Sequence, residues 1–200
     1  MSGAFTEARR LAETARKTFE ELGQTGAVET EWRPVAVNIE LLAGNLPGAE
    51  KWLRASCDAL ERRGDRAYLG TRAAQLANLL AETARIGEAE TWADLAHELG
   101  ASDDIPTQVW WRRARTAILL HRGALADAET LIRDATVLTA ASDHLDNRAH
   151  VLLVQSRVLH ALDRTGEAAE ATNQAIELFE RKGNVVAADR ARAGSRLHAS

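Results

Sequence analysis

The sequence predicts an all-α fold, a right-handed superhelix of antiparallel helix pairs (an α-solenoid) with about ten helices. One alanine recurs every 39 to 41 residues, a period typical of repeat arrays. Apolar residues follow helical spacing throughout, and no stretch keeps the alternation of a strand for long. The chain has only 3 prolines, which leaves long segments free to be helical. The recurring alanines are Ala8, Ala49, Ala89, Ala128 and Ala168.

Two interleaved sets of helices follow from these patterns. Because the segments between them are short, consecutive helices should form antiparallel hairpins. The helices that carry the alanines are expected at roughly 4–21, 47–63, 86–99, 125–141 and 166–182. The helices between them are expected at roughly 27–43, 66–83, 106–122, 145–162 and 185–198.

Prolines and glycines mark the expected helix ends. Pro47 and Pro106 stand where helices should begin, a position that tolerates a missing N–H. Pro34 falls near the start of another helix, so we expect a late start or a kink there. Four glycines follow helical runs and should stop them in the left-handed conformation. They are Gly23, Gly64, Gly100 and Gly183.

The repeats are expected to form a single domain over 1–200, because no linker is long enough to divide the chain. The first unit lacks its first helix, which suggests a fragment of a longer array or a natural domain edge. The units are expected at roughly 1–24, 25–65, 66–104, 105–143 and 144–184, with a terminal helix at 185–200.

A short phrase recurs around each alanine. GNLPGAEKWLRAS contains Gly44, Leu46, Ala49, Leu53 and Ser56, and RGALADAETLIRDA and SGAFTEARRLAETA repeat its pattern. The phrase resembles the second half of a tetratricopeptide repeat, in which a glycine turn leads to a large apolar residue and then to alanines where two helices cross. Five copies in register cover nearly the whole chain, although the two at Ala89 and Ala168 are weaker.

The chain departs from the standard repeat in two ways. Its period is near 40 residues rather than about 34, and its first helices lack a consistent aromatic residue. The longer helices resemble the arrays of MalT-type transcription activators and related bacterial signalling ATPases. Phrases such as DDIPTQVWWRRAR resemble C-terminal arrays of bacterial proteins that join a nucleotide cyclase domain to a signalling ATPase. This resemblance implies a regulatory role inside a larger protein.

Counting back from each alanine separates core positions from variable ones. The position ten residues before the alanine is always apolar and should be core. Trp111 shares a column with Trp32 and Val151 and should also be core, whereas Trp110 shares a variable column with His150. Trp110 is therefore expected to be exposed, with a packing contact between repeats as the equal alternative.

The variable columns lie at offsets of three, seven and ten, which places them on one face of each first helix. In tetratricopeptide arrays that face lines a concave groove, so we expect a surface that reads a ligand. The alternative is a solvated face with no role. A cationic bias among its residues favours an acidic peptide or a carboxylate-bearing ligand. The candidate groove residues are Asn78, Trp110, Arg113, His150, Arg157 and His160.

Composition narrows the partners and the compartment. The net charge is −4 and the pI is about 5.9, which disfavours a general nucleic-acid binder. No apolar run approaches the roughly 18 residues that a membrane span needs, and the N-terminus has no signal-peptide core. A single cysteine, Cys57, suits a reducing cytosol. We therefore expect a cytoplasmic chain with no nucleic-acid or membrane partner.

The sequence carries no motif for catalysis, and we predict no catalytic residue, cofactor or metal. It lacks a glycine-rich phosphate loop, an HExxH motif and a CxxC pair. His144, Asp146 and His150 lie close together, but helix capping and a solvated surface explain them better than a metal does. Cys57 follows a core stripe and is expected to pack there.

The predicted function is binding without catalysis. We expect a protein-interaction or regulatory scaffold of a bacterial signalling protein, with a peptide or protein partner in the groove or other domains of the same protein as partners. The alternative is the small-ligand sensor domain of a MalT-type regulator, which an enclosed polar pocket would favour.

Overall fold

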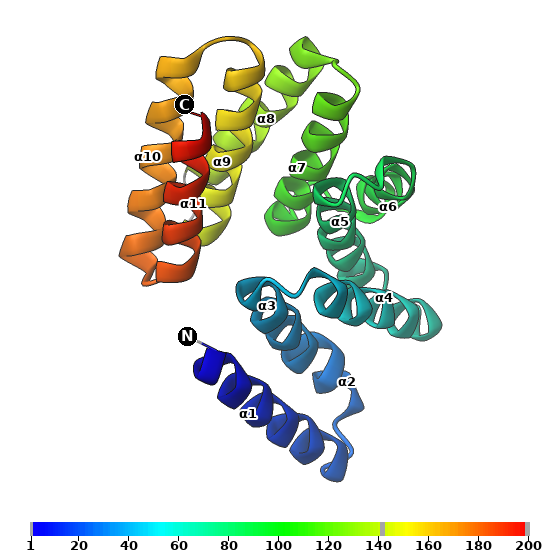
Figure 1. Cartoon of the computed structure of the whole chain (residues 1–200). Helices are drawn as coiled ribbons and strands as arrows, with labels where there is room; N and C mark the ends of the chain where they lie inside the picture. Colours follow the sequence, from blue (N-terminus) through cyan, green and yellow to red (C-terminus); the bar gives the residue numbers. More distant parts are fainter. Residues whose placement is uncertain (1, 141–142, 199–200) are drawn as a thin grey trace.

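The computed structural model describes residues 2–140 and 143–198, and every regular element in that part of the chain is helical. The helices form a curved array in which each one packs against the next (Figure 1). Within the described residues no helix is both long enough and apolar enough to cross a membrane. The elements are α1 (Ser2–Glu21), α2 (Thr25–Ala27), the π-helical turn η1 (Val28–Trp32), α3 (Arg33–Ala43), α4 (Leu46–Arg63), α5 (Arg66–Glu82), α6 (Ile86–Leu99), α7 (Ile105–His121), α8 (Leu125–Ala140), α9 (Leu145–Ala161), α10 (Thr165–Lys182) and α11 (Val185–His198).

Two rows of helices make up the array. The odd-numbered helices α3, α5, α7, α9 and α11 alternate along the chain with α4, α6, α8 and α10, and we call the two sets the inner and the outer row. Figure 1 shows α4, α6 and α10 outside α3, α5 and α9. Each inner helix packs on its outer partner, while α5 also packs on α7 and α7 on α9. This architecture confirms the predicted α-solenoid, and the observed helix bounds lie close to the expected ones. The expected end of one helix at residue 141 falls outside the described residues.

The recurring alanines are the crossing points of neighbouring helices. Ala49, Ala89, Ala128 and Ala168 are all 0% exposed, and Ala8 is half-buried at the edge of the array. A methyl side chain lets two helix axes approach closely, whereas a larger one would hold them apart. Large apolar residues then fill the space around each crossing, including the fully buried Leu53, Leu60, Leu76, Leu80, Ile118, Ile132 and Phe179.

The turn before each outer helix uses one backbone conformation. Gly44 and Gly123 have φ of 77° and 72°, and the residues at the same register, Ala84 and Asp163, have φ of 58° and 59°. Side chains other than glycine adopt this left-handed region at a cost of roughly 1–2 kcal/mol. The repeat geometry therefore imposes a glycine conformation on two residues that are not glycine.

The glycines expected to end helices behave differently from one another. Gly23, Gly64 and Gly183 have φ of 69°, 68° and 80°, as predicted. Gly100 also follows the last residue of its helix, as predicted, but the expected left-handed conformation is wrong there, because Gly100 has φ of −73° in an extended conformation. The side-chain amide of Gln108 on α7 donates a hydrogen bond to the Gly100 carbonyl at 3.0 Å. This bond fixes the turn between α6 and α7.

Pro34 coincides with the expected disturbance of its helix. It stands in the first turn of α3, and the five residues of η1 before it form a wider π-helical turn. Proline offers no N–H to the preceding turn, so the backbone there takes a different hydrogen-bond register.

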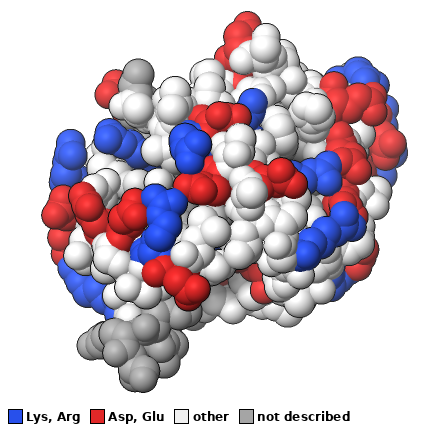
Figure 2. Space-filling model, turned by 90° about the horizontal axis from the view of Figure 1, so that it is seen from above, with Lys and Arg blue, Asp and Glu red and all other residues white. Residues whose placement is uncertain are grey.

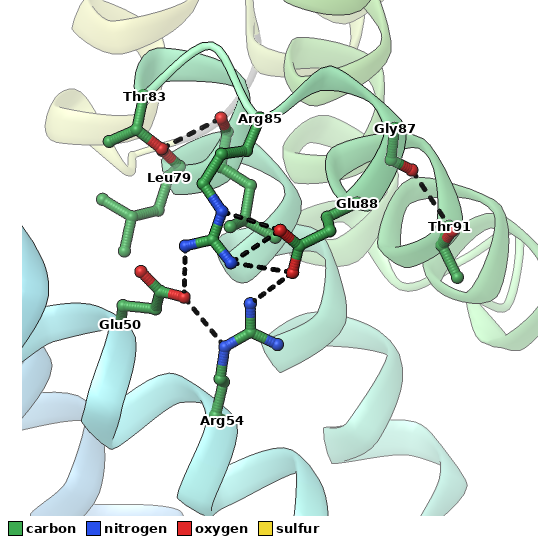
Figure 3. Close-up of polar contacts among 9 residues, drawn as sticks. Glu50, Arg54, Leu79, Thr83, Arg85, Gly87, Glu88 and Thr91 are labelled. Atoms are coloured by element: carbon green, nitrogen blue, oxygen red, sulfur yellow. Dashed lines mark hydrogen bonds and ion pairs between the residues drawn. The ribbon is translucent and has the colours of Figure 1, made fainter.

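Ion pairs connect neighbouring repeats on the outer side. Arg85 donates to Glu50 from the preceding repeat at 2.7 Å and to Glu88 on its own helix (Figure 3). Arg54 completes the network by donating to Glu50 and Glu88, each at 2.8 Å. Exposed pairs contribute little singly, but a closed network holds the repeats in register.

An equivalent ion-pair network occurs two repeats further along the chain. Arg164 donates to Glu129 at 2.6 Å across the repeat boundary and to Glu167 at 2.6 Å on its own helix. On the face seen in Figure 2, basic and acidic side chains are likewise intermixed.

The two ends of the array meet through one side chain. Arg190 on α11 donates to the backbone carbonyls of Leu41 at 2.8 Å and Leu42 at 2.7 Å, which lie near the end of α3. The last carbonyls of a helix have no partner within the helix and attract cations. Arg190 therefore joins the last helix of the inner row to the first.

Replacing Ala84 by glycine should stabilise the protein by about 0.5–1 kcal/mol, because glycine adopts the left-handed conformation without steric cost. The reverse change, Gly123→Ala, should destabilise it by about 1 kcal/mol. An added Cβ at Gly123 would meet no atom within 4 Å, so only the backbone conformation is tested there. Urea unfolding measures both, and two effects of the same sign would contradict the shared turn geometry.

Candidate functional site

The candidate residues lie on the inner helices α5, α7 and α9, and all but His160 are near the middle helix α7, which packs on both of the others. On α7, the Asp104 carboxylate caps the first turn by accepting from the backbone N–H of Thr107 at 3.2 Å. Trp110 and Arg113 follow at a spacing of three residues, which places them on one face of the helix. The Arg113 guanidinium lies 4.4 Å from the centroid of the Trp110 ring, a cation–π contact.

The two adjacent tryptophans have different environments. Trp111 is buried in a cluster with Ala73 and Ala74 of α5, and its indole N–H donates to Gln108, so the predicted core position is confirmed. Trp110 is half-buried and packs against the same cluster. The two expectations for Trp110, exposure and a packing contact between repeats, therefore both hold in part: some of the indole ring packs between repeats and the rest is accessible to solvent.

Asn78 has a structural contact at this junction. It is buried on α5, and its amide nitrogen donates to the carbonyls of Ala74 and Trp110, each at 2.7 Å. Both N–H groups of the amide are therefore used. Asn78 fixes the backbone of α7 at Trp110 against α5, and it has no amide hydrogen left for a ligand.

Arg113 is the most unusual residue of the junction. It is only 4% exposed, and its Nε and Nη1 atoms are buried without a hydrogen-bond partner. Arg72 is also buried and also has an unbonded Nε, but its Nη1 donates to Gln75 at 2.8 Å, and the half-buried Arg33 donates to Glu29 at 2.6 Å. Arg113 differs in having two buried nitrogen atoms without a partner. Burial lowers the pKa of Arg113 to about 10, so it remains a cation at neutral pH.

The charges around Arg113 come from both neighbouring helices. Glu82 at the end of α5 acts to raise the pKa of Arg113, and Arg157 on α9 acts to lower it. Glu82 forms no ion pair with Arg113 among the described contacts. We call Glu82, Trp110, Arg113, His150 and Arg157 the Arg113 cluster.

His150 contributes a neutral ring to this cluster. Its imidazole packs edge-on against Phe179 of α10, with ring centroids 5.0 Å apart. Burial lowers the pKa of His150 to about 3, and the positive charges of Arg113 and Arg157 act in the same direction. The expected cationic bias therefore needs correction: at neutral pH the two arginines carry the charge and His150 does not.

The remaining candidates lie on the same helix. Arg157 is exposed on α9, and His160 is half-buried near the end of that helix. The described contacts of Arg113 do not include His160. Sequence reasoning did not identify Glu82, which belongs to the cluster; an acidic residue near a helix end gives no signal that distinguishes it from solvated surface.

Two surface hollows of the described structure lie away from the Arg113 cluster. One, of about 170 Å³, lies between α1, η1, α3 and α4, beside Trp32 and Trp52 and the ion pair of Arg9 with Glu40. The other, of about 150 Å³, lies between α9 and α10. None of the six candidate residues lines either hollow.

The histidine and carboxylate residues considered for a metal have other contacts. Asp146 accepts a hydrogen bond from Asn184 at 3.1 Å, and His150 faces Phe179. In the part of the chain that the structure describes, no group of three histidine, cysteine or acidic residues is arranged to hold a metal ion.

Acid should destabilise the protein through His150. Its pKa is near 6.5 in the unfolded chain and about 3 in the folded one, so below pH 6.5 the unfolded state binds the proton more readily. This contribution to stability is complete above pH 6.5 and should fall by about 2 kcal/mol at pH 5. Urea unfolding of His150→Gln should show a correspondingly weaker pH dependence. His121→Gln, at an exposed histidine, is the control, and equal slopes in both variants would contradict the assignment.

Replacing Arg113 by methionine should stabilise the protein by about 2 kcal/mol in a chloride buffer, because an unpaired buried cation is removed while a side chain of similar length still packs on Trp110. Arg33→Met is the matched comparison and should destabilise by about 3 kcal/mol, because it leaves the buried Glu29 unpaired. Unfolding in urea measures both. Similar losses in the two variants would show that Arg113 already has a compensating partner.

The comparisons with known proteins agree with the fold and leave the site unassigned. No family model matches the chain. The regulatory protein AfsR of Streptomyces coelicolor is 26% identical over 183 residues, which are 91% of this chain and 18% of that protein. The chain thus spans less than a fifth of this relative's length. Among solved structures, BtubC (BKLC) from P. vanneervenii has a TM-score of 0.58 at 15% identity, covering 97% of this chain and 89% of that one, which is a likeness of fold.

Proposed function

We propose that this chain is a non-enzymatic interaction module of a larger regulatory protein, a tetratricopeptide-like array whose inner row of helices binds an acidic segment of a protein or peptide. The observation that carries this proposal is the Arg113 cluster, where a buried guanidinium has two N–H groups without partners. Such a group gains most from a negatively charged ligand.

The relative and the architecture support the regulatory role. AfsR is named a regulatory protein, and its similarity extends along 91% of this chain. Repeat arrays present long surfaces built from equivalent helices, which suits the binding of extended partners. A module of this kind, in the manner of MalT-type regulators, would report the presence of its partner to domains attached to it. Its single buried cysteine fits a reducing compartment such as the cytoplasm.

The distribution of charge favours the inner row over the outer one. The outer arginines Arg85 and Arg164 are each held by two carboxylates across and within repeats. An acidic partner would have to displace those carboxylates before it gained an ion pair. Arg113 and the exposed Arg157 require no such exchange, and Trp110 supplies an aromatic anchor beside them.

The chemistry of the described residues supports binding rather than catalysis. The Arg113 cluster offers cations and a neutral imidazole, but no hydroxyl or thiol nucleophile is among its members. Cys57 lies in the core of α4, and burial raises its pKa to about 12, so it stays a thiol at neutral pH.

The test measures binding of short fluorescent peptides rich in aspartate and glutamate, with lysine-rich and neutral peptides as references. The folded wild type should prefer the acidic peptides, and Arg113→Glu combined with Arg157→Glu should weaken that binding at least about tenfold. Arg157→Glu alone, at an exposed position, tests the same surface without altering a buried residue. Arg133→Glu on the outer helix α8 makes the same charge change elsewhere and should have no effect. Unchanged affinity in the double variant would refute the proposal.

The second candidate, a small-ligand sensor, is favoured by one observation: Arg113 is only 4% exposed, which admits small groups more readily than a folded surface. A sensor should be stabilised against heating by a particular anionic metabolite through mass action, whereas a peptide-binding scaffold should not respond to such a panel.

A further inference from the structure

We propose that Arg113 forms the centre of an oxyanion site that receives a single carboxylate or phosphate group at the junction of α5, α7 and α9. The site takes a slender group at the end of a flexible chain rather than a flat surface. This inference deepens the function proposed above and rests on it, because it specifies the chemical group by which the ligand is held.

The first argument is the state of the guanidinium. Nε and Nη1 of Arg113 are both buried and unbonded, whereas the buried Arg72 leaves only Nε unbonded and donates through Nη1 to Gln75. Buried N–H groups in folded proteins are normally bonded, and charged ones most strongly require it. Oxygen atoms of an anion would satisfy these donors, and a carboxylate or phosphate presents several of them.

The second argument is the local balance of charge. Arg157 acts on both Arg113 and His150 as a like charge, while Glu82 is the acidic residue that acts on Arg113. None of the described carboxylates forms an ion pair with Arg113 or Arg157, although eighteen ion pairs occur elsewhere in the described structure. A bound anion would supply the missing countercharge to both arginines.

The third argument is preorganisation. Trp110 lies over the guanidinium at 4.4 Å, and the Asn78 amide bonds the Trp110 carbonyl and thereby fixes this turn of α7. The guanidinium is therefore held in place before a ligand arrives. A site of this kind loses little conformational freedom on binding, which favours affinity.

The fourth argument is size. The residue exposes only 4% of its surface, so a broad, flat partner surface cannot contact the guanidinium. A carboxylate or phosphate at the tip of a side chain, a chain terminus or a small metabolite fits that requirement. The shared chemistry is the oxyanion, and its source is what the experiment must separate.

The direct test titrates the whole chain with inorganic phosphate and with glutarate, at constant ionic strength maintained with chloride. We expect saturable binding by NMR and a rise in the melting temperature. The pKa of His150 is lowered mainly by burial and further by the positive charges of Arg113 and Arg157; a bound anion offsets those charges, so the titration midpoint of the ring should move upward.

Arg113→Met should weaken the binding of phosphate and glutarate at least about tenfold. Because this variant loses an unpaired buried charge, it is expected to remain folded, and circular dichroism verifies that. Arg115→Met on the same helix is the matched control and should bind as the wild type does, since Arg115 already pairs with Glu90 and Asp94 of α6. Equal affinity of Arg113→Met and wild type, or no saturable binding by either anion, would overturn the oxyanion site.

A competition experiment identifies the source of the oxyanion. Displacement of a bound acidic peptide by phosphate, together with its loss in Arg113→Met, supports a carboxylate of the partner. Small anions that bind through Arg113 while no acidic peptide binds support a free ligand and refute the peptide-binding function. A peptide that binds Arg113→Met as tightly as wild type refutes the oxyanion site and leaves the proposed function standing.

Discussion

The close crossing of paired helices at small side chains is the constraint on which the rest of this structure depends. At Ala49, Ala89, Ala128 and Ala168 no side-chain surface remains exposed, so each pair of helices has one separation and one rotation. The turn that enters each outer helix is fixed so firmly that Ala84 takes up a glycine conformation. Regular pairs stacked in this way curve, and their inner helices come to lie side by side.

The two rows of helices differ in how their charged side chains are paired. On the outer side, residues such as Glu50 and Arg85 repeat with the helices and pair across each boundary, which ties the repeats together and uses up their charge. On the inner side, α5, α7 and α9 bring Arg113 and Arg157 into one another's field without an equivalent set of carboxylates. The same repetition thus produces outer arginines that are paired with carboxylates and an inner centre where Arg113 and Arg157 have only Glu82 nearby and no ion pair.

The architecture can be predicted from the sequence because residues that pack in equivalent places recur at the period of the repeat. In the apolar column ten residues before the alanine, Leu79, Ile118 and Val158 are buried, and only Ile39, in the first complete repeat, is half-buried. Even the turn at Asp163 is implied by its register with Gly44, although its side chain alone would not suggest a positive φ. Local geometry that is repeated can be predicted from the repeat.

The environment of the candidate residues could not be predicted in this way. Variation within a column was interpreted as exposure, yet Asn78 and Arg113 are buried, because α5 and α7 pack directly on each other at this point in the array. The neutral state of His150 depends on Phe179 from another repeat and on two arginines from two helices. Contacts that occur once, between elements distant in sequence, leave no periodic signal.

A stable array has no need of an unpaired buried arginine, and its neighbours show that a pairing carboxylate is easily placed within one helical turn, as Glu29 is for Arg33. On the proposed function, the partner of Arg113 arrives from outside the chain as the anionic group of a ligand. Because Arg113 exposes only 4% of its surface, that group has to be slender.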